Sequence, residues 1–285
     1  MHPFLKKVLS PLIFLRRYGF QKKVKYFKEF RENLVGILDS DPIISLSDFG
    51  GKFQVDPRSD LFKRAIVSGS YEPDLVRLCL KHLDRERSAI DVGANIGFYT
   101  ILFARELQKG VVLAIEPVPS ALKKLRKNIG INSVASNVLV YEGAATNYGG
   151  YVEINTIEGK EEYSSLGKIV HASVRSDSSV KLRVKCTTID QLTNQYRLNP
   201  GFIKIDAEGA EHKVLEGCNE VLRKNRPTLL VECSEDMLRQ NGSSVFQLIN
   251  FLEEYHYQVI NPLYPGISIR KRRQGNLLCI PAEMS

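Results

Sequence analysis

The sequence predicts an α/β fold built on a mainly parallel, doubly wound β-sheet. Between Ser88 and Ile280, seven short apolar runs have the length and composition of strands, and most are separated by segments with helical spacing of apolar residues. Strands that alternate with helices of this length are joined by right-handed crossovers and pair in parallel. A chain of 285 residues with 43% hydrophobic content suits one such domain with a modest extension.

The predicted elements follow one another in a regular order. The strands are expected at 89–92, 111–115, 137–141, 202–205, 228–232, 257–260 and 276–280. The helices between them are expected at 97–107, 120–129, 211–223 and 245–255. The last two strands are separated by a turn at 264–266 and not by a helix, so we expect the final strand to be antiparallel to the others.

Two parts of the chain depart from this alternation. Residues 148–188 are rich in Gly, Ser, Thr and alternating β-formers, which predicts antiparallel strands and a long loop inserted into the sheet domain. Residues 1–68 precede the first predicted strand, and their first part is basic. We therefore divide the chain into a basic, helical N-terminal extension, 1–68, and a main domain, 69–285.

The charge is concentrated at the N-terminus. The formal net charge is +8, and residues 1–30 carry eight Lys and Arg residues against one acid, so the rest of the chain is nearly neutral. Ser10-Pro11 predicts a helix start, and the apolar run at 11–15 is too short to span a bilayer. The internal Arg16-Arg17 and the lack of a small-residue cleavage site argue against a signal peptide. This arm is expected to pack on its own domain or on a second subunit; the alternative is peripheral contact with an anionic membrane surface.

The cysteines bear on the compartment. The five cysteines are far apart and form no C-x-x-C pair, so we interpret them as reduced core residues and not as disulfides or a zinc site. We expect a cytoplasmic protein, in which any membrane contact occurs at the inner face of a membrane through residues 1–30. A second basic cluster, 270–273, stands near the C-terminus.

One strand–turn–helix segment indicates a nucleotide site. The first strand ends in Asp91-Val-Gly-Ala-Asn-Ile-Gly97, where two glycines let the backbone approach a ligand and a helix N-terminus offers free N–H groups. The second strand ends in Glu116-Pro117, at the position where an acid accepts both ribose hydroxyls. The alternative is a tight turn followed by a solvated acid. The spacing G-x-x-x-G is not that of a dinucleotide site, and the chain has no P-loop motif.

At this point the residues resemble a known family. D-V-G-A-N-I-G-F-Y-T at 91–100, I-E-P at 115–117, K-I-D-A-E-G-A-E at 204–211 with V-L-E-G at 214–217, and L-L-V-E at 229–232 are similar to FkbM-type S-adenosylmethionine-dependent methyltransferases. The resemblance covers about 69–235 and specifies a family but no substrate. It implies the Rossmann-like, seven-stranded sheet of class I methyltransferases, with the last strand antiparallel and a β-rich insertion.

The resemblance also implies where the cofactor binds. The turn after the first strand would cradle the methionine moiety of S-adenosylmethionine, the acid after the second strand would hold the ribose, and the end of the third strand would line the adenine. A G-x-Y-E element at 69–72 places Glu72 at the cleft or, equally, at the cap of a helix at 73–83. The expected cofactor-binding residues are Glu72, Asp91, Gly93, Ala94, Asn95, Gly97, Glu116, Pro117, Gly143 and Ala144.

The acidic stretch 202–217 raises a question about its carboxylates. Asp206, Glu208 and Glu211 follow an apolar strand, and they would serve simply to cap a helix unless a reaction takes place beside them. Under the resemblance this strand tip lies beside the methyl donor, so Asp206 is expected to orient or deprotonate an acceptor hydroxyl. Glu208 and His212 are the second candidates, spaced to share one helix face.

A metal site is considered but not predicted. Asp206 and Glu232 end neighbouring predicted strands, so their carboxylates could flank one cleft and hold Mg²⁺. Two oxygen ligands are too few to predict such a site.

The expected function is therefore methyl transfer from S-adenosylmethionine to a hydroxyl of a sugar, glycan or related metabolite. A nucleic-acid methyltransferase is the first alternative, but Asn261-Pro262-Leu263-Tyr264 lies after the sixth strand and is interpreted as a turn. The second alternative is a non-catalytic binding module, which the intact glycine turn and ribose acid disfavour. The expected partner is a hydroxylated small molecule or glycan and not nucleic acid, and whether the protein is a homo-oligomer is left open. Residues 148–188 and the N-terminal arm are the expected sources of acceptor specificity.

Overall fold

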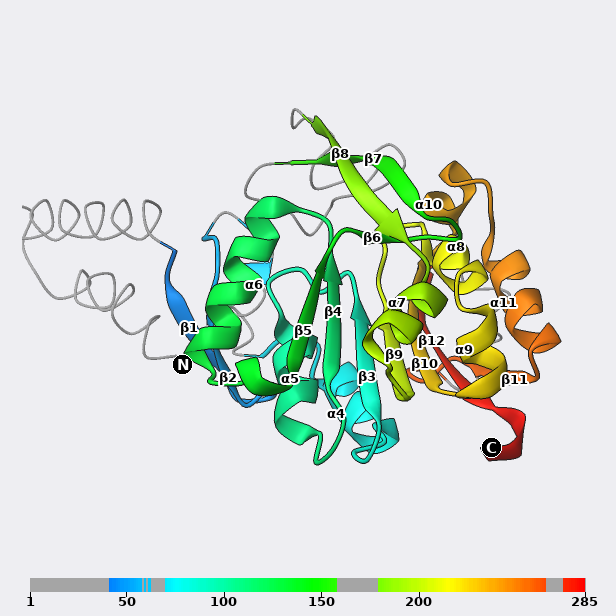
Figure 1. Cartoon of the computed structure of the whole chain (residues 1–285), viewed down its shortest axis with the longest axis horizontal. Coiled ribbons are helices and arrows are strands. Elements are labelled where there is room, and N and C mark those ends of the chain that lie inside the picture. Colours follow the sequence, from blue (N-terminus) through cyan, green and yellow to red (C-terminus); the bar gives the residue numbers. More distant parts are fainter. Residues whose placement is uncertain are drawn as a thin grey trace, which may run out of the picture.

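The computed structural model describes residues 41–57, 59, 61–62, 70–157, 179–264 and 274–284. Its centre is a seven-stranded sheet of order β11-β12-β10-β9-β3-β4-β5 (Figure 1). Six strands run in parallel, and β12 is antiparallel to both of its neighbours. The bounds are β3 Ser88–Val92, β4 Val112–Glu116, β5 Val138–Glu142, β9 Pro200–Ile205, β10 Thr228–Ser234, β11 Tyr257–Ile260 and β12 Gln274–Pro281. The predicted doubly wound sheet with an antiparallel last strand is confirmed.

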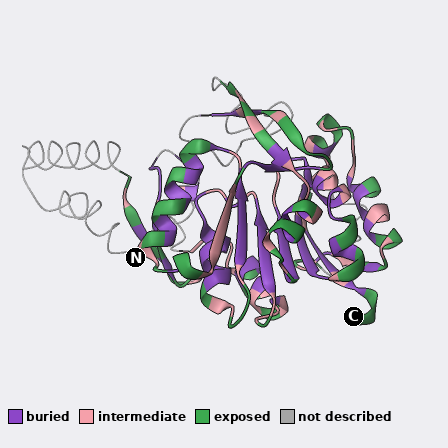
Figure 2. Ribbon diagram, in the orientation of Figure 1, coloured by how far each residue is buried: buried purple, intermediate pink, exposed green. Residues whose placement is uncertain are grey.

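Helices cover both faces of the sheet, because successive strand residues point to opposite faces. Ala89 and Phe202 face a core shared with α4 (Pro73–His82), α5 (Phe98–Glu106) and α6 (Pro119–Ile131). Ile90 and Ile203 face a second core shared with α7 (Ile189–Tyr196), α8 (Glu211–Glu216), α9 (Asn219–Lys224), α10 (Glu235–Gln240) and α11 (Val245–Glu254). Figure 2 shows the central strands as the buried layer between these helices. The described chain also contains two short 3-10 helices, Ala135–Asn137 and Ala282–Met284.

Residues 43–54 of the predicted N-terminal extension form a β-hairpin and not a helix. β1 (Ile43–Leu46) and β2 (Gly51–Gln54) pair antiparallel, and Phe53 is fully buried in the core with α5 and α6. The Asn128 side chain of α6 accepts a hydrogen bond from the backbone N–H of Gln54 at 2.7 Å. Residues 41–57 are thus packed into the main domain. The basic arm, 1–30, with its predicted helix lies outside the described residues, as does the basic cluster 270–273.

The predicted β-rich insertion forms a second, three-stranded sheet. β6 (Ala144–Ala145) follows directly on β5 and pairs in parallel with β8 (Val180–Thr187), which pairs antiparallel with β7 (Gly150–Thr156). Because β6 continues from the carboxyl end of β5, this sheet stands at the carboxyl edge of the main sheet (Figure 1). Residues 158–178, between β7 and β8, lie outside the described part of the chain.

The prediction of a single helix at 211–223 is wrong, because the chain forms two helices, α8 and α9, that are separated at Gly217. A Cβ atom on Gly217 would lie 2.2 Å from the carbonyl oxygen of Thr146, so the helix meets the backbone that follows β6. The Asp190 carboxylate then accepts hydrogen bonds from the first N–H groups of α9, those of Glu220 and Val221, at 2.9 Å each. A tertiary contact and a distant cap therefore decide where the second helix begins.

In the part of the chain that the structure describes, no helix has the length and apolar character needed to cross a bilayer.

Candidate active site

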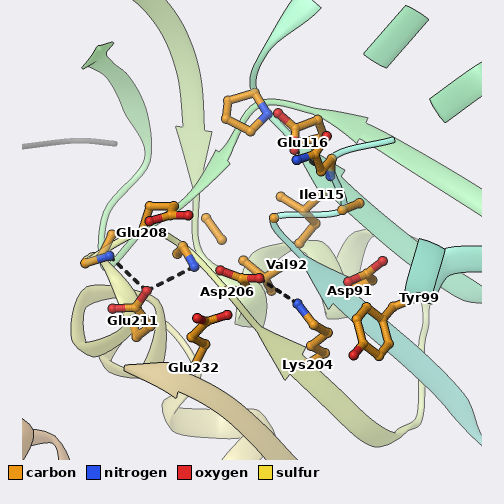
Figure 3. A pocket seen from close by; sticks show the side chains of 18 of the residues that line it. Asp91, Val92, Tyr99, Ile115, Glu116, Lys204, Asp206, Glu208, Glu211 and Glu232 are labelled. Carbon is orange, nitrogen blue, oxygen red and sulfur yellow. Dashed lines mark hydrogen bonds and ion pairs between the residues drawn. The ribbon is translucent and has the colours of Figure 1, made fainter. Parts of the chain in front are cut away.

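A cavity of about 260 Å³ opens at the carboxyl ends of β3, β4, β9 and β10. The chain order of the strands reverses between β3 and β9, which is where open α/β sheets bind their ligands. The walls come from the turns that follow β3, β4 and β9, from Glu72 before α4, and from α10 (Figure 3). Strand parity places the polar side chains together, since Asp91, Lys204 and Glu232 occupy positions on the α4–α6 face of their strands.

The two glycines of the β3 turn are required by the protein's own packing. Gly93 has a φ of 76°, and a Cβ atom on it would lie 1.8 Å from the carbonyl oxygen of Asp206. Gly97 caps α5 with a φ of 95°, and a Cβ atom there would lie 2.6 Å from Leu125. The sequence predicts that these glycines let the backbone approach a ligand. The structure shows another physical reason for Gly93: without a Cβ atom, it lets the backbones of the β3 and β9 turns touch. Gly93 lines the cavity, whereas Gly97 does not.

Glu116 joins the turns that follow β3 and β4. Its carboxylate accepts hydrogen bonds from the backbone N–H groups of Asn95 and Val118, both at 2.8 Å. Only 5% of the residue is exposed, and this burial raises the pKa of the carboxyl to about 7, although the two N–H donors oppose the rise. Glu116, Pro117, Ala94 and Asn95, all expected to bind the cofactor, line the cavity.

Two buried side-chain oxygens beside this turn have no hydrogen-bond partner among the described residues. The Asp91 carboxylate is 1% exposed and accepts a hydrogen bond from Thr100 Oγ1 through Oδ2 at 2.6 Å, but its Oδ1 has none among the described residues. The Oδ1 atom of Asn95 is likewise buried without a hydrogen bond in the described structure. Native proteins rarely leave such acceptors unpaired, so these atoms fit a ligand that donates hydrogen bonds.

Lys204 lies at the base of the cavity and was not predicted as a site residue. It is the direct cross-strand partner of Asp91, and its ammonium lies 2.9 Å from Asp206 Oδ2 and 4.7 Å from the centre of the Tyr99 ring (Figure 3). Burial lowers the pKa of Lys204, but the charges of Asp206 and Asp91 outweigh it, so the net pKa is well above its usual range. Lys204 is therefore a charged, buried lysine held by two carboxylates.

The acidic stretch after β9 divides into different roles. Glu211, 2% exposed, accepts hydrogen bonds from the N–H groups of Ala207 and Gly209 at 3.1 and 2.9 Å, so it is the residue that caps the turn. Burial raises the pKa of Glu211 to about 7. Asp206 has a side chain that is 29% exposed to the cavity and makes no cap hydrogen bond in the described structure. The negative charge of Asp206, with burial, raises the pKa of Glu232 well above its usual range.

The structure resolves the two alternatives for Glu72. Its side chain makes no cap hydrogen bond to α4; instead, its Oε2 accepts a hydrogen bond from the Tyr99 hydroxyl at 2.8 Å. The residue lines the cavity in a left-handed backbone conformation, with a φ of 49°. Glu72 therefore belongs to the wall of the site.

The structure separates some residues that the sequence grouped together. Glu208 lines the cavity but lies in the turn before α8, with a φ of 49°, so it shares no helix face with His212 and that expectation is wrong. His212 instead hydrogen-bonds Ser243 and packs against Phe251 of α11, outside the cavity lining. Gly143 hydrogen-bonds the Glu116 carbonyl beside the cavity, while Ala144 lines it.

Asp206 and Glu232 do flank one cavity, as predicted. Among the described residues, no group of three or more His, Cys, Asp or Glu side chains has the arrangement of a metal site.

One family model and several known proteins are similar to this chain. A family model described as the Methyltransferase FkbM domain matches residues 91–259. The hexuronic acid methyltransferase AglP of Haloferax volcanii is 23% identical over 203 residues, which are 71% of this chain and 78% of that protein. Methyltransferase sdnD of Sordaria araneosa is 24% identical over 155 residues, or 46% of this chain and 60% of that protein.

Two solved structures are similar at low sequence identity. Methyltransferase FkbM from Methylobacillus flagellatus has 19% identity and a TM-score of 0.45, covering 70% of this chain and 44% of that one. M. jannaschii TYW2 in complex with AdoMet has 16% identity and a TM-score of 0.44, covering 84% of each chain. This chain thus spans less than two thirds of the S. araneosa protein and of the M. flagellatus chain.

Proposed function

Because the chain belongs to the FkbM methyltransferase family, we propose that it transfers a methyl group from S-adenosylmethionine to a hydroxyl of a sugar, glycan or related metabolite. One observation carries the proposal. A single cavity holds the β3 turn and Glu116 on one side and the carboxylates of Asp206 and Glu232 on the other. A nucleotide-type site and a set of acids suited to proton transfer therefore share one space.

The residues present fit S-adenosylmethionine in two respects. The cofactor carries amine and hydroxyl donors, and Asp91 Oδ1 and Asn95 Oδ1 are buried acceptors that have no partner in the described structure. It is also a cation at sulfur, and the described wall of the cavity carries several carboxylates against the one ammonium of Lys204. When bound, the cofactor supplies a methyl group already activated for transfer. Asp91, Asn95 and Glu116 would hold it.

Asp206 is the residue that we assign to the acceptor. A hydroxyl becomes a competent nucleophile when a base within hydrogen-bond reach takes its proton. Asp206 is partly exposed in the cavity, and Lys204 holds it through Oδ2, which leaves Oδ1 to accept that proton. Glu208 is the second candidate, because it also lines the cavity. We assign no such role to His212, because its ring hydrogen-bonds Ser243 away from the cavity.

The acceptor class is supported by one relative. AglP is named a hexuronic acid methyltransferase, which favours a sugar hydroxyl or carboxyl as the acceptor here as well. The carboxylates of Asp206 and Glu208 would repel an acidic acceptor and tolerate a neutral one. We therefore expect a neutral sugar hydroxyl to be preferred over a hexuronate carboxylate.

The test is methyl transfer from labelled S-adenosylmethionine to three classes of acceptor: neutral glycans, hexuronate-containing glycans and RNA. The methyl group is then located by mass spectrometry and NMR. Methyl on a glycan oxygen is the expected result. Methyl on RNA or on nitrogen would contradict the proposal, and cofactor binding without transfer to any class would favour the non-catalytic alternative.

A further inference from the structure

Lys204 is an unusual residue at its position in the sheet. It lies within β9, between the fully buried Ile203 and Ile205, and its side chain is only 7% exposed. Removing an ammonium from water costs several kcal/mol unless opposite charges and hydrogen bonds replace the hydration. An apolar residue at this position would therefore stabilise the fold more than a lysine, unless the charge has a function in the cavity.

The contacts of Lys204 point into the proposed site. Its ammonium lies between the Asp206 carboxylate, at 2.9 Å, and the ring of Tyr99, whose hydroxyl is held by Glu72 (Figure 3). Among the described residues that line the cavity, Lys204 is the one Lys or Arg. It therefore balances the charge of several acids and contacts one of them directly.

We infer that Lys204 is a positioning residue for methyl transfer, which holds the Asp206 carboxylate through one oxygen and leaves the other oxygen turned to the acceptor. This inference rests on the proposed function. Lys204 does not touch the reacting atoms in this account; it acts through Asp206. Without the ammonium, Asp206 would face Glu232 and Asp91 with no opposing charge, and a proton would be retained in the cluster.

The surroundings determine the direction of the pH effect. Asp206 and burial raise the pKa of Glu232, and the positive charge of Lys204 opposes that rise. Loss of Lys204 makes every carboxylate nearby harder to ionise, so the acid limb of the pH–rate profile moves to higher pH. The groups that act on Lys204 from the elements around it are Asp206 of the β9 turn, Asp91 of β3, Cys79 of α4, Glu72 before α4, Tyr99 of α5 and Glu232 of β10.

The chain offers a matched control for a purely structural ion pair. Lys124 and Asp56 form a second buried pair, at 3.4 Å, with side chains 10% and 6% exposed. Neither residue lines the cavity. Lys124→Met therefore removes a buried ammonium from an aspartate, as Lys204→Met does, but outside the site.

The experiment compares Lys204→Met and Lys124→Met with the full-length wild type. For Lys204→Met we expect kcat to fall about 100-fold near neutral pH, the acid limb to move up by about one pH unit, and the affinity for S-adenosylmethionine by calorimetry to stay within about threefold or to tighten. Lys124→Met should lose stability and keep the wild-type pH profile. An unmoved acid limb in Lys204→Met would overturn the inference.

A second measurement needs no lysine variant, in case Lys204→Met does not fold. The ammonium of Lys204 is followed by ¹⁵N NMR in the unliganded wild type, and we expect it to stay protonated from pH 6 to 10 and its signal to move in Asp206→Asn. Titration of Lys204 below pH 9 would overturn the inference. A wild type that binds no S-adenosylmethionine would instead refute the proposed function, whatever the NMR result.

Discussion

The turn after β3 and the turn after β9 leave neighbouring parallel strands at the same edge of the sheet, yet they present different chemistry. Both use left-handed residues and a glycine to reverse direction before a helix, Asn95 with Gly97 in one and Glu208 with Gly209 in the other. The β3 turn from 93 to 97 carries no charged side chain and presents backbone N–H groups. The β9 turn carries Asp206, Glu208 and Glu211.

The acids at the two strand tips differ in the same sense. Asp91 is sealed at 1% exposure and fixed by Thr100, whereas the Asp206 side chain is 29% exposed and fixed by Lys204. A buried carboxyl group contributes to the electrostatic field of a site. A carboxyl group that is accessible from the cavity is able to exchange a proton with a ligand. We therefore propose that the β3 turn binds the cofactor and that the β9 turn exchanges the proton.

The largest expected effect comes from Asp206→Asn. Removing a general base while keeping its shape lowers rates by about 10²–10⁴-fold, so kcat should fall in that range while the affinity for S-adenosylmethionine stays close to wild type. The measurement is steady-state methyl transfer together with calorimetry.

Asp190→Asn is the matched control, because Asp190 caps α9 outside the cavity. It should cost about 1 kcal/mol of stability and leave kcat unchanged. Wild-type turnover in Asp206→Asn would remove the β9 turn from the chemistry.

Gly93→Ala tests the contact between the two turns. The new Cβ would lie 1.8 Å from the Asp206 carbonyl at a φ of 76°, so both turns must shift. We expect the free energy of unfolding to fall by about 3 kcal/mol or more, with loss of both cofactor binding and turnover. Urea denaturation measures the first effect.

Gly130→Ala is its control, since this glycine lies within α6 and a Cβ there meets nothing within 4 Å. That change should be neutral or stabilise by about 0.5–1 kcal/mol. Equal stability of the two variants would contradict the close contact of the turns.

Glu211→Gln separates the capping acid from the reacting acid. The pKa of Glu211 is raised from 4.5 to about 7 in the folded state, so the folded protein holds a proton that the unfolded chain releases. The contribution of Glu211 to the free energy of unfolding is therefore full below about pH 4.5. It is lost as the pH rises to about 7, by an amount on the order of 2–3 kcal/mol. Denaturation curves across this range should show a smaller decline in Glu211→Gln than in wild type, with part of the decline remaining because Glu116 shifts in the same direction. Identical declines would show that Glu211 is not the titrating group.

The smallest expected effect is that of chelation. Lys204 already holds Asp206 through Oδ2, and backbone N–H groups occupy Oε1 of Glu211, so the chain itself engages these two oxygens. Turnover in excess EDTA should equal that of the untreated protein. A loss of activity that Mg²⁺ restores would bring a metal into the β9 turn.

Much of the fold was predictable because periodicity and strand–helix alternation are local properties. All seven strands of the main sheet and the antiparallel last strand were predicted, as was the β-rich insertion. The break at Gly217 was not, since it depends on the backbone of Thr146, 71 positions earlier in the chain. The β1–β2 hairpin was not predicted either, because its strands have only four residues each and are fixed by packing of the buried Ile44, Leu46 and Phe53 on the main domain.

The residues of the site likewise fall into those that local sequence predicts and those that depend on tertiary contacts. The β3 turn and Glu116 follow from a motif with fixed spacing, and the structure brings them together at one cavity. Lys204 depended on cross-strand register with Asp91, which a single sequence does not reveal. A signal was nevertheless present, because one lysine inside the apolar run Phe202–Ile205 is unexplained unless acids surround it.

The most direct test of the separate roles of the β3 and β9 turns is a calorimetric titration of S-adenosylmethionine into the wild type and into Asp206→Asn. The account predicts binding of one cofactor per chain in both proteins, with dissociation constants within about threefold of each other. No binding by the wild type, or a tenfold loss of affinity in Asp206→Asn, would contradict it.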